Sequence, residues 1–232
     1  GQRSAVEHRK LSVRCDGPPD RRGTGGYHSL CLWPRWKPVE KLDKSGEEVY
    51  FYNALNQQTA VLLLDGSEQE NLYDAEYLRA GMTWNGNRTS FSYYNGELLA
   101  ENGQGGDTTC RYILGYGVAA GWNRGKEGYH YYHLDEQNST AYITGENTEI
   151  KNHYRYDGFG VVLSQQEEVS NRILYTGQQY DQASGQYNLR ARYYNPVVGR
   201  FMQEDVYRGD GLNLYAYCGN NPVVYYDPSG YN

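Results

Sequence analysis

A repeated arrangement of alternating tyrosines, an Asp or Asn, and a turn constrains the fold of this chain most. It occurs in four stretches, "EEVYFYNALNQQTAVLLLDG", "RTSFSYYNGELLAENG", "GYHYYHLDEQNSTAYITGENTEI" and "NHYRYDGFGVVLSQQEEV", and each returns through Leu, Val or Ile. Gly46, Gly66 and Gly86 lie 20 residues apart, an interval that fits one hairpin. Self-similarity at this length indicates stacked units that bury their faces only against neighbouring units.

The stretch "HYRYDGFG" shows how one such unit is expected to fold. Alternate residues of a strand face the same side of a sheet, so Tyr154 and Tyr156 share one face while Arg155 and Asp157 share the other. The Asp157-Gly158 pair is expected to supply the positive φ that a tight hairpin needs. Each repeat therefore predicts a hairpin with one aromatic face.

The composition agrees with a turn-rich β protein. Tyrosine contributes 26 and glycine 28 of the 232 residues. A tyrosine ring packs on its neighbours while its hydroxyl stays in water, so such sheets tolerate solvent nearby. Only "LYDAEYLRAG", at 72–81, is compatible with a short helix. No apolar run reaches the roughly 18 residues of a membrane span. We therefore expect an all-β fold, a curved antiparallel sheet.

Charge divides the chain near residue 40. Residues 1–40 hold eight of the 22 Lys and Arg residues, but only four of the 28 acids and one of the 26 tyrosines. They show neither strand nor helix periodicity, which predicts a disordered or unrelated lead-in. A basic arm for nucleic acid is the alternative, but the acidic remainder argues against a nucleic-acid partner.

The repeats resemble the YD repeat of RHS (rearrangement hot spot) proteins. Residues 128–232 resemble the RHS repeat-associated core domain, and residues 41–127 resemble degenerate YD units. The matching pieces are "YHYYHLDEQNSTAYIT", "YRYDGFG", "YTGQQYDQASGQYNLRARYYNPVVGRF", "GLNLYAYCGNNPV" and "YYDPSG". Many independent positions match, which makes this resemblance more specific than one short motif.

The resemblance implies a container. RHS proteins wind β-strips into a hollow shell, and the core domain curls inward as a plug. The plug ends in a DPxG signature, here Asp227-Pro228-Ser229-Gly230, after which the family attaches a variable effector. The expected partners are therefore that effector and upstream repeats, whereas cell-surface glycans are the partner in the alternative of an adhesive module. A secreted or cell-surface bacterial protein without cofactor or metal is implied.

The resemblance also implies one reaction, an aspartic-type cut of the chain's own backbone beyond the signature. The matching residues are Arg192, Asp205 and Asp227. Two carboxyl groups held close share a proton and can act as base and acid toward water and a peptide bond. A guanidinium can orient one carboxylate or stabilise the oxyanion. Without the family, Asp205 is a turn acid and Asp227 an Asx-turn residue before proline.

Other residues of the tail have structural interpretations. Turn chemistry is expected at Gly199, Asn221 and Pro222, and also around Asp181 and Asp210. Pro228 and Gly230 complete the signature. Arg200 is either a second basic residue near the carboxyl pair or a surface residue in a salt bridge.

Metal and phosphate sites find little support in the sequence. His130 and His133 lie three apart, which puts them on opposite faces of a strand. The cysteines show no metal-site spacing and are expected as free thiols, at positions 15, 31, 110 and 218. The "GYGVAAG" stretch at 115–121 is expected to be a glycine hairpin rather than a phosphate loop.

Two classes of function remain open. One is the self-processing shell and gate of a polymorphic toxin, and the other is a cell-surface module whose tyrosines stack on glycans. A glycosidase ranks third, because no carboxylate pair stands out before the tail. The set Arg192, Asp205 and Asp227 discriminates between the first two, because only self-cleavage needs it.

The charge boundary generates the first prediction. We expect trypsin to cut after Arg14, Arg21 and Arg22 within minutes and to leave residues from about 41 onward intact, because disordered segments are cut first. Mass spectrometry of a limited digest measures this. Protection of these three arginines would place the lead-in within the folded domain.

Overall fold

The computed structural model describes residues 40–43, 46–207 and 213–231. These residues form two antiparallel sheets, which confirms the all-β expectation. The large sheet consists of β1 (Glu40–Asp43), β2 (Gly46–Tyr52), β3 (Gln58–Leu62), β4 (Glu68–Leu72), β5 (Gly81–Trp84), β6 (Asn87–Tyr94), β7 (Glu97–Asn102), β8 (Thr108–Leu114), β9 (Val118–Asn123), β10 (His130–Leu134), β11 (Thr140–Thr144), β12 (Ile150–Tyr156) and β13 (Val162–Glu167). The small sheet consists of β14 (Gln179–Asp181), β15 (Gln186–Asn188), β16 (Tyr193–Asn195) and β17 (Arg200–Phe201). Two single-turn 3-10 segments are η1 (Tyr175–Gly177) and η2 (Cys218–Asn220).

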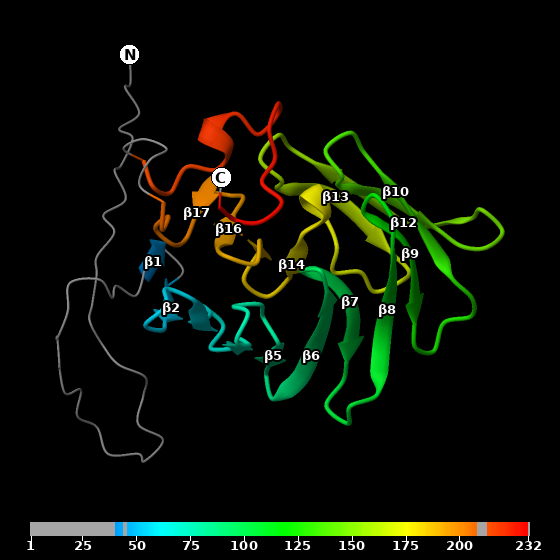
Figure 1. Cartoon of the computed structure of the whole chain (residues 1–232), viewed down its shortest axis with the longest axis horizontal. Coiled ribbons are helices and arrows are strands. Elements are labelled where there is room, and N and C mark those ends of the chain that lie inside the picture. The colour runs from blue at the N-terminus through cyan, green and yellow to red at the C-terminus, as the bar shows by residue number, and fades with distance from the viewer. Residues whose placement is uncertain (1–39, 44–45, 208–212, 232) are drawn as a thin grey trace.

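The large sheet is a meander in which each strand pairs with the next one in sequence. It curves, and its strands pass around the small sheet and the C-terminal segment (Figure 1). The sheet continues through the pair β9–β10, across the expected boundary at 127/128. That division of the chain stays a prediction, and the expected lead-in, apart from Glu40, lies outside the described residues.

Alternation along the strands sorts the side chains between two faces. In β12 the Tyr154 ring is buried and Arg155 is exposed, while Tyr154 and Tyr156 stack with ring centroids 6.4 Å apart. The shared aromatic face expected for this strand is confirmed. The buried side chains of the inner face pack with those of the C-terminal segment, including Tyr187 and Tyr194, in one hydrophobic core.

Eight loops of the described part share one five-residue geometry. The N–H of residue 1 donates to the carbonyl of residue 5, and the N–H of residue 4 donates to the carbonyl of residue 1. Residue 4 always has a positive φ. The loops are 53–57, 63–67, 74–78, 103–107, 135–139, 145–149, 157–161 and 174–178. Two tighter turns, at Asn85-Gly86 and Asn95-Gly96, have two positive φ angles each, as type I′ hairpins require.

The Asp or Asn that follows the paired tyrosines in the repeat is the first residue of such a loop, and its side chain has a structural role there. In four loops its Oδ1 accepts the N–H groups of residues 3 and 5, which the loop leaves without a carbonyl partner. These four residues are Asn53, Asp74, Asp135 and Asp157.

One local expectation was wrong, and the one stretch compatible with a short helix forms a loop instead. The positive φ of loop 157–161 belongs to Gly160, with φ of 88°, and not to Gly158. Loop 74–78 replaces the short helix at 72–81, because Asp74 binds the N–H groups of Glu76 and Leu78. By contrast, the glycine hairpin expected at 115–121 is confirmed between β8 and β9.

The loop geometry generates a prediction at Asp157. We expect Asp157→Ala to lower the free energy of unfolding by about 1–2 kcal/mol, because two N–H groups lose their acceptor. Asp157→Asn keeps the accepting oxygen and is the matched control. Urea denaturation followed by tyrosine and tryptophan fluorescence measures both. Equal losses in the two variants would show that the carboxamide oxygen does not replace the carboxylate.

Candidate functional site

The structure brings Arg192 and Asp205 into contact. Arg192 stands directly before β16, and Asp205 follows β17, the next strand of the small sheet. Their Nη2 and Oδ2 atoms lie 2.7 Å apart, and both side chains are less than a tenth exposed. The antiparallel pairing of β16 with β17 brings these positions, 13 residues apart in sequence, to the same end of the small sheet.

Arg192 holds several segments together. Its Nε donates to the carbonyl of Gly230 at 2.5 Å, and its Nη1 donates to the carbonyl of Leu214 at 3.3 Å. Its guanidinium lies 3.7 Å from the centroid of the Phe201 ring, a cation–π contact. These contacts fix the orientation of the guanidinium in a buried place.

Asp227 is fully buried. Its Oδ1 accepts the N–H groups of Ser229 at 2.9 Å and Gly230 at 2.8 Å, so the Asx-turn interpretation is confirmed. Burial lowers the pKa of Arg192, and the charges of Asp205 and then Asp227 oppose that change. Arg192 therefore interacts electrostatically with both carboxyl groups.

The turn role expected for Asp205 is present together with the ion pair. Its Oδ1 accepts the N–H of Tyr207 at 2.8 Å, which leaves Oδ2 for Arg192. Its own N–H donates to the carbonyl of Leu214 at 2.9 Å. A turn role and a role in a site use different oxygens and are compatible.

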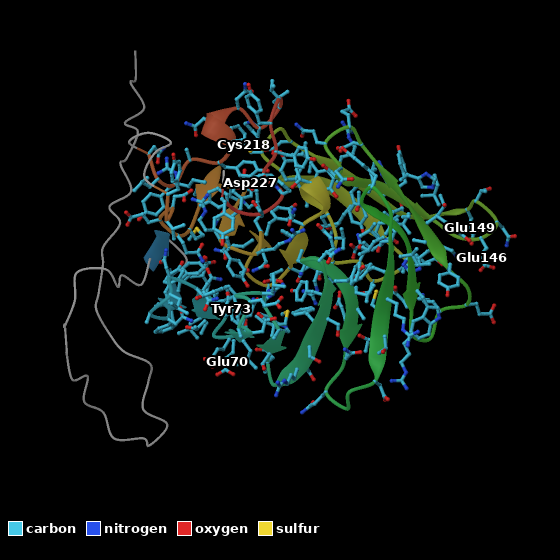
Figure 2. The ribbon with its side chains drawn as sticks, viewed as in Figure 1. Glu70, Tyr73, Glu146, Glu149, Cys218 and Asp227 are labelled. Carbon is cyan, nitrogen blue, oxygen red and sulfur yellow. The ribbon has the colours of Figure 1, made fainter. Side chains whose placement is uncertain are left out.

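A cavity of about 290 Å³ opens beside the Arg192–Asp205 pair. Arg192, Asp205 and Gly230 line it together with Leu55 and Tyr77, which come from loops of the large sheet. Figure 2 shows Asp227 on the C-terminal segment, far from Glu146 and Glu149 in the loop between β11 and β12. The site thus combines a cation, a carboxylate and the backbone of the signature in one cavity.

Gly230 is required by its surroundings. Its φ is 81°, and a Cβ at this position would lie 2.5 Å from the carbonyl oxygen of Leu189. A side chain is excluded both by backbone conformation and by space. Pro228 precedes this turn, and its carbonyl accepts a long hydrogen bond of 3.4 Å from Gln178.

The remaining tail residues occupy turns and surface. Gly199 has a φ of 66°, the carbonyl of Asn221 accepts the N–H groups of residues 224 and 225, and the carbonyl of Pro222 accepts the Gln137 amide at 2.5 Å. The turn roles expected at these three positions are confirmed. Arg200 is exposed in β17, and Asp210 lies outside the described residues.

The turn expected at Asp181 was wrong, because Asp181 lies in β14 and is buried between two arginines. Its Oδ2 lies 2.5 Å from Arg79 and its Oδ1 lies 3.2 Å from Arg172. Gln69 donates a further hydrogen bond of 2.8 Å to Oδ2. Burial alone would raise the pKa of Asp181, but the two arginines and these hydrogen bonds outweigh it and lower the pKa.

The two arginines link this carboxylate to both sheets. Arg79 also donates to Gln179 at 2.7 Å and to Tyr193 at 2.9 Å, both in the small sheet. Arg172 pairs with Glu101 of β7 at 3.3 Å. We call Arg79, Glu101, Arg172 and Asp181 the buried ion network. The alternation of polar and apolar residues along the strands could not predict this network, because Arg79 lies outside any strand.

The histidines and cysteines form no metal site among the residues that the structure describes. His130 is buried, and burial lowers its pKa, whereas His133 is exposed with its Nε2 2.9 Å from Thr144. Their opposite faces are confirmed. Cys110 and Cys218 are buried free thiols, and Cys15 and Cys31 lie outside the described residues. Within the described ranges, no helix is long and apolar enough to cross a membrane.

Comparison of the sequence with known proteins identifies toxin proteins as relatives. No family model matches the chain. It is 33% identical over 171 residues to the tRNA3(Ser)-specific nuclease WapA of Bacillus spizizenii, covering 68% of this chain and 7% of that protein. It is 32% identical over 101 residues to the toxin protein Tse5 of Pseudomonas aeruginosa, covering 43% and 8%. It is 38% identical over 90 residues to the toxin subunit YenC1 of Yersinia entomophaga, covering 38% and 9%.

Solved structures show the same fold. The Photorhabdus luminescens Tc holotoxin pore superposes with a TM-score of 0.67 at 21% identity, covering 84% of this chain and 10% of that chain. The complex TcdB2–TccC3 superposes with a TM-score of 0.65 at 21% identity, covering 79% and 10%. The chain therefore spans 7–10% of the length of these relatives and structures.

The buried ion network generates a prediction at Arg79. We expect Arg79→Met to lower the free energy of unfolding by about 3–5 kcal/mol, because one partner of a buried pair is lost. Arg111→Met, on the exposed side of β8, is the control and should change it by about 0.5 kcal/mol or less. Urea denaturation at pH 7 measures both. Similar small losses would show that Arg172 alone satisfies Asp181.

The same network predicts an acid limit of stability. The folded-state pKa of Asp181 is lowered, so its contribution is complete above the ordinary value of 3.8 and is lost as the pH falls through the folded-state value. We expect the protein to lose stability below about pH 4. Asp181→Asn should be less stable at pH 7 and depend less steeply on pH in acid. An unchanged acid profile would contradict this assignment.

Proposed function

We propose, from the premise that this chain is homologous to RHS/YD-repeat polymorphic toxin proteins, that it forms the end wall and gate of a protein shell. The gate cuts its own backbone beyond Gly230 and releases a C-terminal effector. The observation that carries this proposal is the ion pair between Arg192 and Asp205 in a cavity that Gly230 also lines. Carboxylate, cation and the expected path of the cut chain meet there.

The reaction is the hydrolysis of one peptide bond. One carboxylate takes a proton from water as the water oxygen attacks the peptide carbonyl. The other carboxyl group gives a proton to the amide nitrogen as the C–N bond breaks. The products are one carboxyl group and one amine for each water consumed.

We infer distinct roles for the three residues. Asp205 lines the cavity and can contact the attacking water. Arg192 is fixed by Phe201 and Gly230, so its guanidinium can stabilise the oxyanion without reorganisation. Asp227 holds the N–H groups of Ser229 and Gly230 and supplies the second carboxyl group. No cofactor enters this scheme.

The proposal includes the setting of the reaction. Upstream repeats complete the shell, the effector is its cargo, and the assembly acts outside a bacterial cell. The curvature of the 13-stranded sheet, which bends around the small sheet, supports the shell (Figure 1). The short share of each relative that the chain covers supports the presence of further shell parts in such proteins.

A carbohydrate-binding surface is the second candidate. Tyr142 and His153 stack with ring centroids 4.8 Å apart at an interplanar angle of 17°, and Tyr142 is exposed on β11. Tyr131, on the neighbouring strand β10, is exposed as well. Aromatic faces of this kind stack on sugar rings. This function needs none of the gate residues.

Self-cleavage is tested in a longer chain, in which Asn232 is followed by the residues that the natural gene encodes downstream of it. We expect a single cut beyond Gly230, with a rate independent of protein concentration because the reaction is intramolecular. Asp205→Asn and Asp227→Asn each retain shape and should slow it about a hundredfold or more. Arg192→Ala should slow it to a similar degree, because a cation near the oxyanion is lost.

Mass spectrometry of the purified chains measures the cut, and circular dichroism checks that each variant is folded. Asp107→Asn, in an exposed pair with Arg124, is the matched control and should cut at the wild-type rate. Arg192→Lys, which keeps the charge, covers the case in which Arg192→Ala fails to fold. Equal cutting in wild type and both gate Asp variants would leave the carbohydrate-binding candidate ahead.

A further inference from the structure

Two loops of the large sheet contribute to the lining of the gate cavity. Loop 53–57 joins β2 to β3, and loop 74–78 lies between β4 and β5. They contribute Leu55 and Tyr77 to the cavity. Both side chains are apolar in character and largely solvent-exposed, at 60% and 55%. They lie more than 100 residues before the gate residues in sequence.

Tyr77 occupies a position that does not suit it. It is the fourth residue of its loop, with a φ of 66°. In the other seven loops this position is held by Gly, Asn or Thr. A bulky side chain in this conformation is strained, and such strain persists where the side chain has another use. The ring is not part of the core, and it lines the cavity.

The loops are tied to the gate. The Asn56 side chain donates to the carbonyl of Glu204, the residue before Asp205, at 3.2 Å. A direct hydrogen bond therefore links loop 53–57 to the segment that carries Asp205. Gly230 and Tyr231 line the same cavity, so a peptide that continues from them starts within it.

We propose that Leu55 and Tyr77 form a subsite for one apolar side chain of the peptide that follows Gly230. The subsite rests on the proposed function and deepens it, because it selects which bond the gate cuts. A side chain held between these residues fixes the register of the peptide. The carbonyl to be attacked is then placed against Arg192 and Asp205, which line the same cavity.

Size and charge set the chemistry of the occupant. A cavity of about 290 Å³ admits one large side chain and adjoining backbone. Glu204 and Asp205 both line it, so an acidic side chain there would meet two carboxyl groups. Contact with Leu55 and the ring of Tyr77 favours an aliphatic or aromatic side chain.

The test attaches ten Gly and Ser residues and a small folded reporter domain after Asn232. A single Leu is moved through the ten positions, one per chain. We expect cutting when Leu stands at one position or two adjacent positions. At that position, Ser, Asp or Lys should lower the rate roughly tenfold or more. Mass spectrometry locates the cut, and a time course gives the rate.

The wall is tested by Leu55→Ser combined with Tyr77→Gly. Glycine suits the positive φ of position 77, and Leu55 is exposed, so this variant should fold. We expect the double variant to cut a Leu-bearing extension no faster than an extension with Ser at the same position. Leu64→Ser combined with Tyr116→Ser changes two exposed residues that do not line the cavity and should retain the Leu preference.

Occupancy is measured separately from cutting. In the Asp205→Asn chain, we expect slower hydrogen exchange over 53–57 and 74–78 with the Leu-bearing extension than with the Gly and Ser one. Slower exchange without cutting in the Asp205-intact chain would retain the subsite and remove self-cleavage. Equal cutting with Leu, Ser, Asp and Lys would overturn the subsite and retain self-cleavage. Neither slower exchange nor cutting would overturn both.

Discussion

The arrangement of the two sheets depends on the ion pairs that the buried carboxylate of Asp181 forms with Arg79 and Arg172. A meander that pairs only with itself gains its hydrogen bonds locally but leaves its concave face in need of a partner. Asp181 supplies a polar anchor at that face, because Arg79 beside β5 and Arg172 after β13 both reach it. A buried charge tolerates little displacement of its partners, so the network fixes how the small sheet sits within the large one. Apolar packing around it, by contrast, accepts many similar arrangements.

The hairpin loops provide the second constraint, and they act locally. Residue 4 needs a positive φ and residue 1 benefits from an acceptor for two N–H groups, so the loop chemistry can be read from four or five residues. The same geometry serves another purpose where a loop faces the C-terminal segment. Loop 53–57 contacts Glu204 through Asn56, and loop 74–78 ends next to Arg79. Two of the repeated loops thereby line the cavity beside Arg192 and Asp205.

This difference in range explains what could be predicted from the sequence. The strands, their alternating faces and the turns at Gly199 and Asn221 depend on near neighbours, and they were predicted correctly. The choice of Gly158 over Gly160 failed because a two-residue turn was assumed where Asp157 builds a five-residue loop. Arg79 and Asp181 lie 102 residues apart, so no local pattern links them. Arg192, Asp205 and Asp227 were identified only through the family resemblance, since each also satisfies its own turn or packing.

Asp205 and Asp227 are both turn residues and candidate catalytic residues, and there is a physical reason why the two roles can coincide. A protein that cuts itself once has no need to admit or release substrate, so its reacting groups can be part of well-packed structure. Asp227 closes the turn at Gly230, and Gly230 cannot accept a side chain there. In the proposed self-cleavage, the backbone after Gly230 would therefore be positioned before the reaction begins, which is how intramolecular reactions gain high effective molarity. Arg192 is likewise held by Phe201, Leu214 and Gly230 together. A residue that reacts only once, within its own chain, can therefore also have a structural role in a turn.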